Sequence, residues 1–326
     1  MPEATEHLGL ALSGGGFRAT LFHVGVVRAL AEVGLLSRVT HITSVSGGSV
    51  LGAHLVLNWK AYAESSHAFA RAAAGPPDQA ERAIREASEL FDDASKPLLD
   101  FIGTDVRGRI IRRLPINLLA SGIARFLCST VGNFCGEALR GQLLAFAEGR
   151  GPLEQLVHHF EGLFNGKNLC DLHQAGVPRL VILTTEVGSM ELGWFTSDGF
   201  TQPHSNSSVG RDILTVAQSV AASAAFPALF PPARLDGNEF KLPLAVDSFV
   251  TDAGVYDNLG ISAFLGGQPF AEEDFPVLVS DATATSEWSS TNVPNLLTNL
   301  LRSVEDRKST RLNSSHSRAS RMPSSA

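Results

Sequence analysis

Short apolar runs and helix-spaced apolar positions alternate along the first part of the chain. Leu8–Leu12 is an apolar run that stops at a serine and three glycines, as a buried parallel strand would. Residues 19–36 then carry apolar side chains at helical spacing, and residues 39–45 are rich in β-branched side chains. Residues 47–74 predict a second, long helix that a Gly-Pro-Pro sequence ends. This order of elements is the opening of an α/β sheet.

The middle and the end of the chain continue the pattern. Residues 79–149 show helical spacing without a clear strand, and we expect an inserted helical cap there. Residues 180–185 and Val277–Ser280 predict further buried strands, and residues 211–225 predict a helix. Residues 244–249 predict a strand that leads into a turn of sequence TDAG.

The composition changes abruptly at residue 306. Residues 306–326 are rich in serine and arginine and almost free of apolar side chains, and they resemble the translation of a sequencing-library adapter. We therefore expect one α/β domain over residues 1–305 and exclude the tail from it. A natural disordered basic tail is the alternative. On the adapter interpretation the native C-terminus is missing, and the helix pattern of residues 293–305 is cut partway.

Charge and composition exclude several classes of function. The chain has 326 residues and a formal charge of −7, with no basic block before the tail, so we expect no nucleic-acid partner. The three cysteines fit neither a disulfide framework nor a zinc site, and we expect no metal or other cofactor. No secretory signal or membrane-spanning apolar run is visible. These features favour a cytoplasmic protein, either free or lying against a membrane.

A glycine-rich turn follows the first strand. Gly14, Gly15 and Gly16 let the backbone approach a ligand, because glycine has no Cβ and tolerates positive φ. Their amides precede a helix N-terminus, which favours an anion such as a phosphate or the oxyanion of acyl transfer. The spacing also fits a relaxed dinucleotide fingerprint, and a nucleotide-binding protein is an alternative function. The acidic residue that this fingerprint requires after the second strand is missing.

The second strand ends in the sequence SVSGG, residues 44–48. A serine with small residues two positions before and two positions after it, between a strand and a helix, is typical of a nucleophile elbow. This turn would expose the Ser46 hydroxyl beside a helix N-terminus, where negative charge is stabilised. A plain helix cap is the alternative role for Ser46. Ser223, flanked by alanines at the end of a helix pattern, is a weaker candidate nucleophile.

A nucleophilic serine needs a base, and the histidines are poorly placed to serve as one. The chain order Ser–Asp–His needs a late histidine, but after Asp252 the sequence has only His316, in the tail. Asp252 itself follows an apolar strand, and burial or a hydrogen bond to Ser46 would make it an effective base. An aspartate that caps its own turn is the alternative.

These three motifs, in this order, resemble the patatin-like phospholipase family over residues 8–281. The resemblance implies an α/β, three-layer fold with a central, mostly parallel sheet, flanking helices and a helical insertion. It implies a lipid acyl hydrolase that cleaves carboxylic esters, with Ser46 acylated and Asp252 completing a dyad without histidine. It also implies that Gly14, Gly15 and Gly16 form the oxyanion hole. The supporting positions are Arg18, Gly47, Gly48 and Gly254.

Two further features bear on activity and partners. The family usually has glycine where this chain has Ala253; if that position needed positive φ, alanine would be strained by about 1–2 kcal/mol. A catalytically weak protein that only binds lipid is therefore a further alternative. Residues 106–127 mix arginines with leucines and isoleucines, and such a segment can contact a membrane surface. A cap helix packed on the core is the alternative for that segment.

Overall fold

The structure is a computed structural model. It describes residues 7–104 and 151–283, apart from residues 204, 206, 228–229, 243–245, 266–268 and 271–274. The expected cap beyond residue 104, the segment 106–127 and the tail 306–326 lie outside the described residues.

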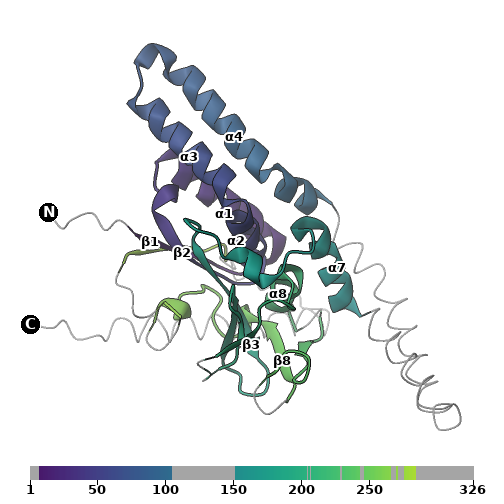
Figure 1. The fold of residues 1–326 in the computed structure, drawn as a ribbon. Coiled ribbons are helices and arrows are strands. Elements are labelled where there is room, and N and C mark those ends of the chain that lie inside the picture. The colour runs from purple at the N-terminus through teal and green to yellow at the C-terminus, as the bar shows by residue number, and fades with distance from the viewer. Residues whose placement is uncertain are drawn as a thin grey trace, which may run out of the picture.

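Within these ranges a nine-stranded sheet forms the centre of the molecule (Figure 1). Its order is β6-β5-β4-β3-β2-β1-β9, with β8 beside β3 and β7 beside β8. The strands are β1 (Leu8–Leu12), β2 (Val39–Ser44), β3 (Arg179–Glu186), β4 (Leu192–Thr196), β5 (Gly199–Thr201), β6 (Ser208–Gly210), β7 (Ala233–Leu235), β8 (Ser248–Asp252) and β9 (Val277–Ser280). Strands β9, β1, β2 and β3 are parallel, and antiparallel strands extend the sheet beyond β3. The expected α/β sheet is confirmed.

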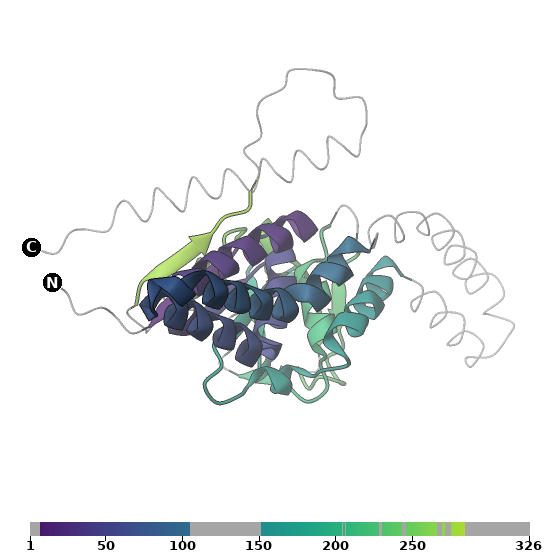
Figure 2. The ribbon, with the colours of Figure 1, turned by 90° about the horizontal axis from the view of Figure 1, so that it is seen from above.

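Helices cover one face of this sheet (Figure 2). They are α1 (Gly16–Glu32), α2 (Gly47–Leu57), α3 (Trp59–Ala74), α4 (Pro77–Gly103), α7 (Pro152–Phe164) and α8 (Val216–Ser223). Side chains alternate along β3, so Leu180 and Ile182 join the large core under these helices. Val181 and Leu183 point to the other face, where a smaller core includes residues of the 3₁₀ turns η4 (Ala253–Val255) and η5 (Ser262–Phe264).

The helix predicted over residues 47–74 is two helices that meet at Asn58. The Asn58 side chain donates a hydrogen bond to the His54 carbonyl (2.8 Å), and the Asn58 carbonyl accepts one from Ala61 N–H (3.0 Å). Asn58 therefore ends α2 and starts α3. The break lets α2 lie buried against the sheet while α3 runs outward beside α4 (Figure 1).

Other helix and strand boundaries differ from the predicted ones by a few residues. The helix expected over residues 211–225 is only Val216–Ser223, because Thr215 and Gln218 form a capping box that starts it late. Helix α1 begins at Gly16, three residues earlier than the apolar spacing indicated. Strand β8 begins at Ser248 and includes Thr251 and Asp252, so this aspartate ends a strand instead of lying inside a turn.

Candidate active site

Ser46 connects β2 to α2 in a backbone conformation that residues with a side chain rarely adopt. Its φ is 52° and its ψ is −117°, and its amide donates a hydrogen bond to Ser223 Oγ (3.0 Å). Ser46 holds the N-cap position of α2, but its side chain makes no capping hydrogen bond. The geometry is that of a sharp strand-to-helix elbow in which the hydroxyl is not used to cap the helix.

The two glycines after Ser46 are needed because backbone lies against them. A Cβ on Gly47 would be 2.0 Å from the carbonyl oxygen of Gly16, and a Cβ on Gly48 would be 2.5 Å from that of Leu12. Thr20 Oγ1 also donates to the Gly47 carbonyl (2.7 Å), which ties α1 to the elbow. The elbow and the glycine loop therefore form one packed unit.

The three glycines of the loop differ in what their amides do. Gly14 N–H already donates to the Asn258 carbonyl (2.9 Å). Gly15 has φ 143° and is the N-cap of α1, and Gly16 has φ 65° and is its first residue. Amides at the start of a helix have no partner within the helix, so Gly15 and Gly16 can offer their N–H groups to an anion. Arg18 lies exposed on the first turn of α1.

Asp252 is buried at the end of β8, with 2% of its surface exposed. Its Oδ1 accepts a hydrogen bond from Gly254 N–H (2.7 Å), which is the role of Gly254 here. Ala253 follows in η4, fully buried, and is not among the described residues with positive φ. The backbone strain considered for alanine at this position therefore does not arise.

The register of β3 shows how the elbow and the aspartate approach each other. Parallel β2 pairs with β3 up to Ser44 opposite Ile182, while antiparallel β8 ends with Asp252 opposite Thr184. Because β4 occupies the other edge of β3, β2 and β8 share one edge with their carboxyl ends facing. Ile182, opposite Ser44, and Thr184, opposite Asp252, are two residues apart on β3, which is about 7 Å along a strand. Strand β2 ends at Ser44, two residues before Ser46.

The two candidate reacting groups are not directly hydrogen-bonded to each other. Among the described residues no hydrogen bond joins Ser46 Oγ to the Asp252 carboxylate, which accepts one from Gly254 N–H. Ser223 and Ala225 link the two segments instead: Ser223 Oγ accepts from Ser46 N–H, and the Ala225 carbonyl accepts from Asp252 N–H (3.1 Å).

Two groups that support the site were missed in the sequence. Asp257, 7% exposed, accepts hydrogen bonds from the amides of Leu259 and Gly260 (both 3.1 Å) and of Ser262 (2.7 Å). This carboxylate shapes the loop that brings the Asn258 carbonyl to the glycine loop. Its signal was an aspartate followed within three residues by glycine, which is typical of a side chain that binds its own turn.

Ser223 is the second missed group. The sequence indicates it only as a weaker candidate nucleophile, whereas the structure buries it fully and hydrogen-bonds it to Ser46 N–H and to Ser49 Oγ (2.9 Å). Its hydroxyl accepts the hydrogen bond from Ser46 N–H and so stabilises the elbow. Only the contact between α8 and α2 reveals this role.

The histidines near the site are used in packing. His41 stacks on Phe275 with ring centroids 4.8 Å apart. His54 Nδ1 lies 3.2 Å from Tyr62 Oη, and burial lowers the pKa of His54 to about 4. In the described part of the chain, no three His, Cys, Asp or Glu side chains gather as metal ligands. No helix described there combines the length and apolar character needed to cross a membrane.

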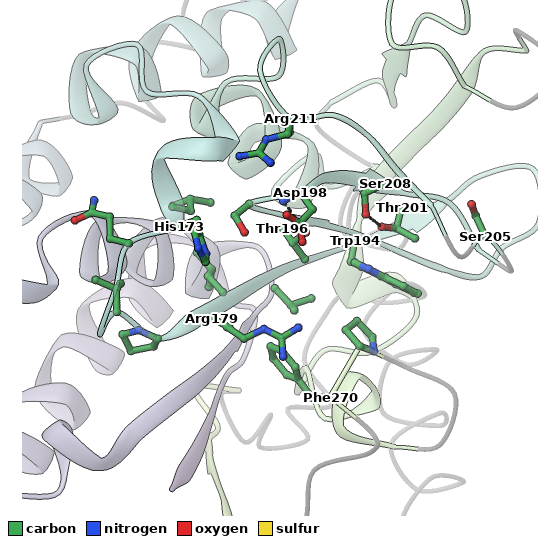
Figure 3. A pocket seen from close by; sticks show the side chains of 18 residues that line it. His173, Arg179, Trp194, Thr196, Asp198, Thr201, Ser205, Ser208, Arg211 and Phe270 are labelled. Atoms are coloured by element: carbon green, nitrogen blue, oxygen red, sulfur yellow. Dashed lines mark hydrogen bonds between the residues drawn. The ribbon is translucent and has the colours of Figure 1, made fainter.

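A cavity of about 560 Å³ lies at the opposite end of β3 (Figure 3). Arg179, the first residue of β3, lines it together with Trp194, Arg211 and Phe270. Its lining includes neither the elbow nor Asp252 nor the glycine loop. We therefore separate this cavity from the candidate active site.

Comparison with known proteins assigns the chain to a family. No curated protein sequence matches it. Among solved structures, a crystal structure of VipD from Legionella pneumophila is similar, with 19% sequence identity and a TM-score of 0.36. The match covers 78% of this chain but only 47% of the VipD chain, so this chain spans less than half of VipD. The family model of patatin-like phospholipases matches residues 10–265, which include the glycine loop, the elbow and Asp252. The chain belongs to the patatin-like phospholipase family, a family of lipid acyl hydrolases.

Proposed function

We propose that this chain hydrolyses carboxylic esters of lipids through an acyl-enzyme on Ser46, with Asp252 as the only side-chain base. The observation that carries the proposal is the elbow at Ser46. A serine held at φ 52°, with a hydroxyl that caps nothing, follows β2, and the carboxyl end of β2 meets the buried carboxyl end of β8, the strand that carries Asp252. Strained backbone of this kind clusters at functional sites.

The first half of the reaction acylates the serine. Asp252 takes the proton from Ser46 Oγ while this oxygen attacks the ester carbonyl carbon. The carbonyl oxygen becomes an oxyanion, which the Gly15 and Gly16 amides stabilise by hydrogen bonds at the N-terminus of α1. The intermediate then collapses, the carbon–oxygen bond to the alcohol breaks, and Asp252 returns the proton to the leaving alcohol.

The second half releases the fatty acid. Asp252 takes a proton from a water molecule, and the resulting hydroxide attacks the acyl carbon. Collapse of this second intermediate breaks the bond to Ser46 Oγ, and Asp252 returns the proton to the serine. The protein ends as it began, and ester plus water has become acid plus alcohol.

The lack of a direct hydrogen bond between Ser46 Oγ and the Asp252 carboxylate is compatible with this mechanism. Catalytic hydrogen bonds are often long in the absence of substrate and shorten when it binds, and one water molecule can also relay the proton. The carboxylate is oriented in advance by Gly254 N–H, and its burial excludes bulk water from the base.

Labelling with a fluorophosphonate probe tests the proposal, because only an activated serine reacts with it. We expect the wild-type chain to be labelled and to release fatty acid from a lysophospholipid. Ser46→Ala abolishes both signals, and Asp252→Asn lowers both by roughly 10³-fold or more, as loss of a catalytic base does.

Ser223→Ala is the matched control, since this serine lies one hydrogen bond from Ser46 but is not the proposed nucleophile. We expect this variant to keep a labelled band, at a reduced rate. Labelling that survives Ser46→Ala, or that disappears only in Ser223→Ala, would refute the assignment of the nucleophile. A chain that binds lipid vesicles but is never labelled would favour the lipid-binding alternative.

A further inference from the structure

A buried histidine lies directly beneath the glycine loop. His23 of α1 is fully buried, with Nε2 2.9 Å from the Ser13 carbonyl oxygen and Nδ1 2.7 Å from Ser280 Oγ. A carbonyl oxygen can only accept, so Nε2 carries the hydrogen. Burial lowers the pKa of His23 and outweighs the opposing effects of the Ser13 hydrogen bond and of Asp281. In the neutral ring Nδ1 therefore accepts from the Ser280 hydroxyl.

The peptide group between Ser13 and Gly14 is hydrogen-bonded at both its carbonyl and its N–H, and His23 is the partner of the carbonyl. The Ser13 carbonyl and the Gly14 N–H belong to the same planar trans peptide and point in opposite directions. The carbonyl accepts from His23, and the N–H donates to the Asn258 carbonyl (2.9 Å). Two hydrogen bonds from opposite sides thus set the rotation of this peptide plane.

The end of β9 holds the remaining polar groups of Ser13. Ser13 N–H donates to the Ser280 carbonyl (3.1 Å), and Ser13 Oγ accepts from Ala282 N–H (2.8 Å). The residues after this anchored peptide have wide intrinsic conformational freedom, because Gly15 and Gly16 carry no side chains and both have positive φ. The orientation of their amides therefore depends on the groups that hold the neighbouring chain, which include the anchored peptide before them.

We infer that His23 is a positioning residue for the reaction: through the Ser13–Gly14 peptide, its imidazole directs the Gly15 and Gly16 amides at the oxyanion. The inference rests on the proposed function and adds a group that touches neither substrate nor Ser46. Ser280 is the second member of this device, because its hydroxyl donates to Nδ1 of His23 and holds the orientation of the ring.

The alternative is that His23 only stabilises the core. A purely structural histidine would affect the free energy of unfolding, whereas kcat of the folded fraction would not change. A positioning residue acts on the transition state. Misdirected oxyanion donors lower kcat and leave KM nearly unchanged, since the ground-state ester does not use these amides fully.

The experiment compares His23→Leu, His23→Gln and Ser280→Ala with the wild type in the full chain. It measures kcat and KM for a soluble ester, the inhibition constant of a trifluoromethyl ketone, and urea unfolding. We expect His23→Leu to lower kcat roughly 10- to 100-fold at constant KM and to weaken the ketone, which forms an oxyanion, in proportion. His23→Gln should recover part of the loss, because its amide can donate to the Ser13 carbonyl.

His54→Leu is the matched control: it removes another buried histidine, whose partner is Tyr62 and not the loop. We expect it to lower stability with little change in kcat. Wild-type kcat in the folded fraction of His23→Leu, or a change in KM alone, would overturn the inference while leaving the proposed function intact. If His23→Leu does not fold, His23→Gln and Ser280→Ala decide in the same way. A wild-type chain that the fluorophosphonate does not label would refute the proposed function itself, and the positioning role with it.

Discussion

At the scale of single residues, the site depends on one strained serine and on the glycines that accommodate it. A positive φ at a residue with a side chain costs on the order of 1–3 kcal/mol, and surrounding contacts must offset it. At Ser46 these contacts are the hydrogen bond to Ser223 Oγ and the close packing of Gly47 against the Gly16 carbonyl. The elbow conformation and the glycine loop therefore stabilise each other.

Gly47→Ala tests this coupling. Its added Cβ would meet the Gly16 backbone at 2.0 Å, so the loop or the elbow must move. We expect a loss of about 2 kcal/mol or more of unfolding free energy and a loss of activity larger than the unfolded fraction explains. Urea unfolding and ester hydrolysis measure the two effects.

Gly25→Ala is the control for this substitution. Gly25 lies within α1 with nothing within 4 Å of the added Cβ, so alanine should stabilise the helix by about 0.5–1 kcal/mol. If both variants behave alike, the close approach of the two backbones is not important for the site.

At the scale of elements, the segment from η4 to η5 joins the two halves of the site. It begins next to Asp252, presents the Asn258 carbonyl to Gly14, and is bonded to β2 where Thr43 Oγ1 donates to the Gly260 carbonyl (2.7 Å). The segment has little regular structure of its own. The Asp257 carboxylate, which binds three of its amides, supplies the order.

Asp257→Ala should therefore loosen this segment without touching the proposed reacting groups. Three amides lose a charged acceptor in a largely buried turn, and leaving one such group unpaired typically costs about 1–3 kcal/mol. We expect a lower unfolding free energy and faster hydrogen exchange over residues 257–262, together with a reduced kcat. Unchanged exchange of the Gly260 and Ser262 amides would contradict this role.

At the scale of the whole molecule, we expect two buried histidines to make the fold sensitive to acid. Burial is the main cause that lowers the pKa of both His23 and His54, and it brings that of His54 from 6.5 to about 4. The unfolded chain therefore binds more protons than the folded one between these values. Stability from this source is complete above pH 6.5 and is lost as the pH falls toward 4.

Urea unfolding near neutral pH and near pH 4 measures this loss. For His54 the lowered pKa corresponds to about 3 kcal/mol, at about 1.4 kcal/mol per pKa unit. We expect the unfolding free energy of the wild type to fall by about 3 kcal/mol or more between neutral pH and pH 4. His54→Gln, which does not titrate, should show a clearly smaller fall. An equal fall in both proteins would show that His54 does not contribute to acid unfolding.

The local parts of the site were predictable because each depends on residues that are close in sequence. The apolar run Leu8–Leu12, the glycines after it and the serine before Gly47 and Gly48 identify a strand, a loop and an elbow by local sterics alone. The family match over residues 10–265 agrees with that interpretation. The break at Asn58 was not predictable, since apolar and small residues continue through it and only packing of α3 on α4 explains it.

By itself, the sequence determined the opening order of strand, helix, strand and helix, the glycine loop, the strand-to-helix turn at Ser46 and the late aspartate, because these follow from local periodicity and from residues without side chains. It did not indicate the antiparallel strands β4 to β7 or helix α7. Tertiary structure decided what the same residues do together. The shared edge of β3 brings Asp252 toward Ser46, Asn258 occupies the Gly14 amide, and His23 and Ser280 hold Ser13 from beneath. These contacts join positions as far apart in sequence as Ser13 and Ser280, which no local pattern encodes.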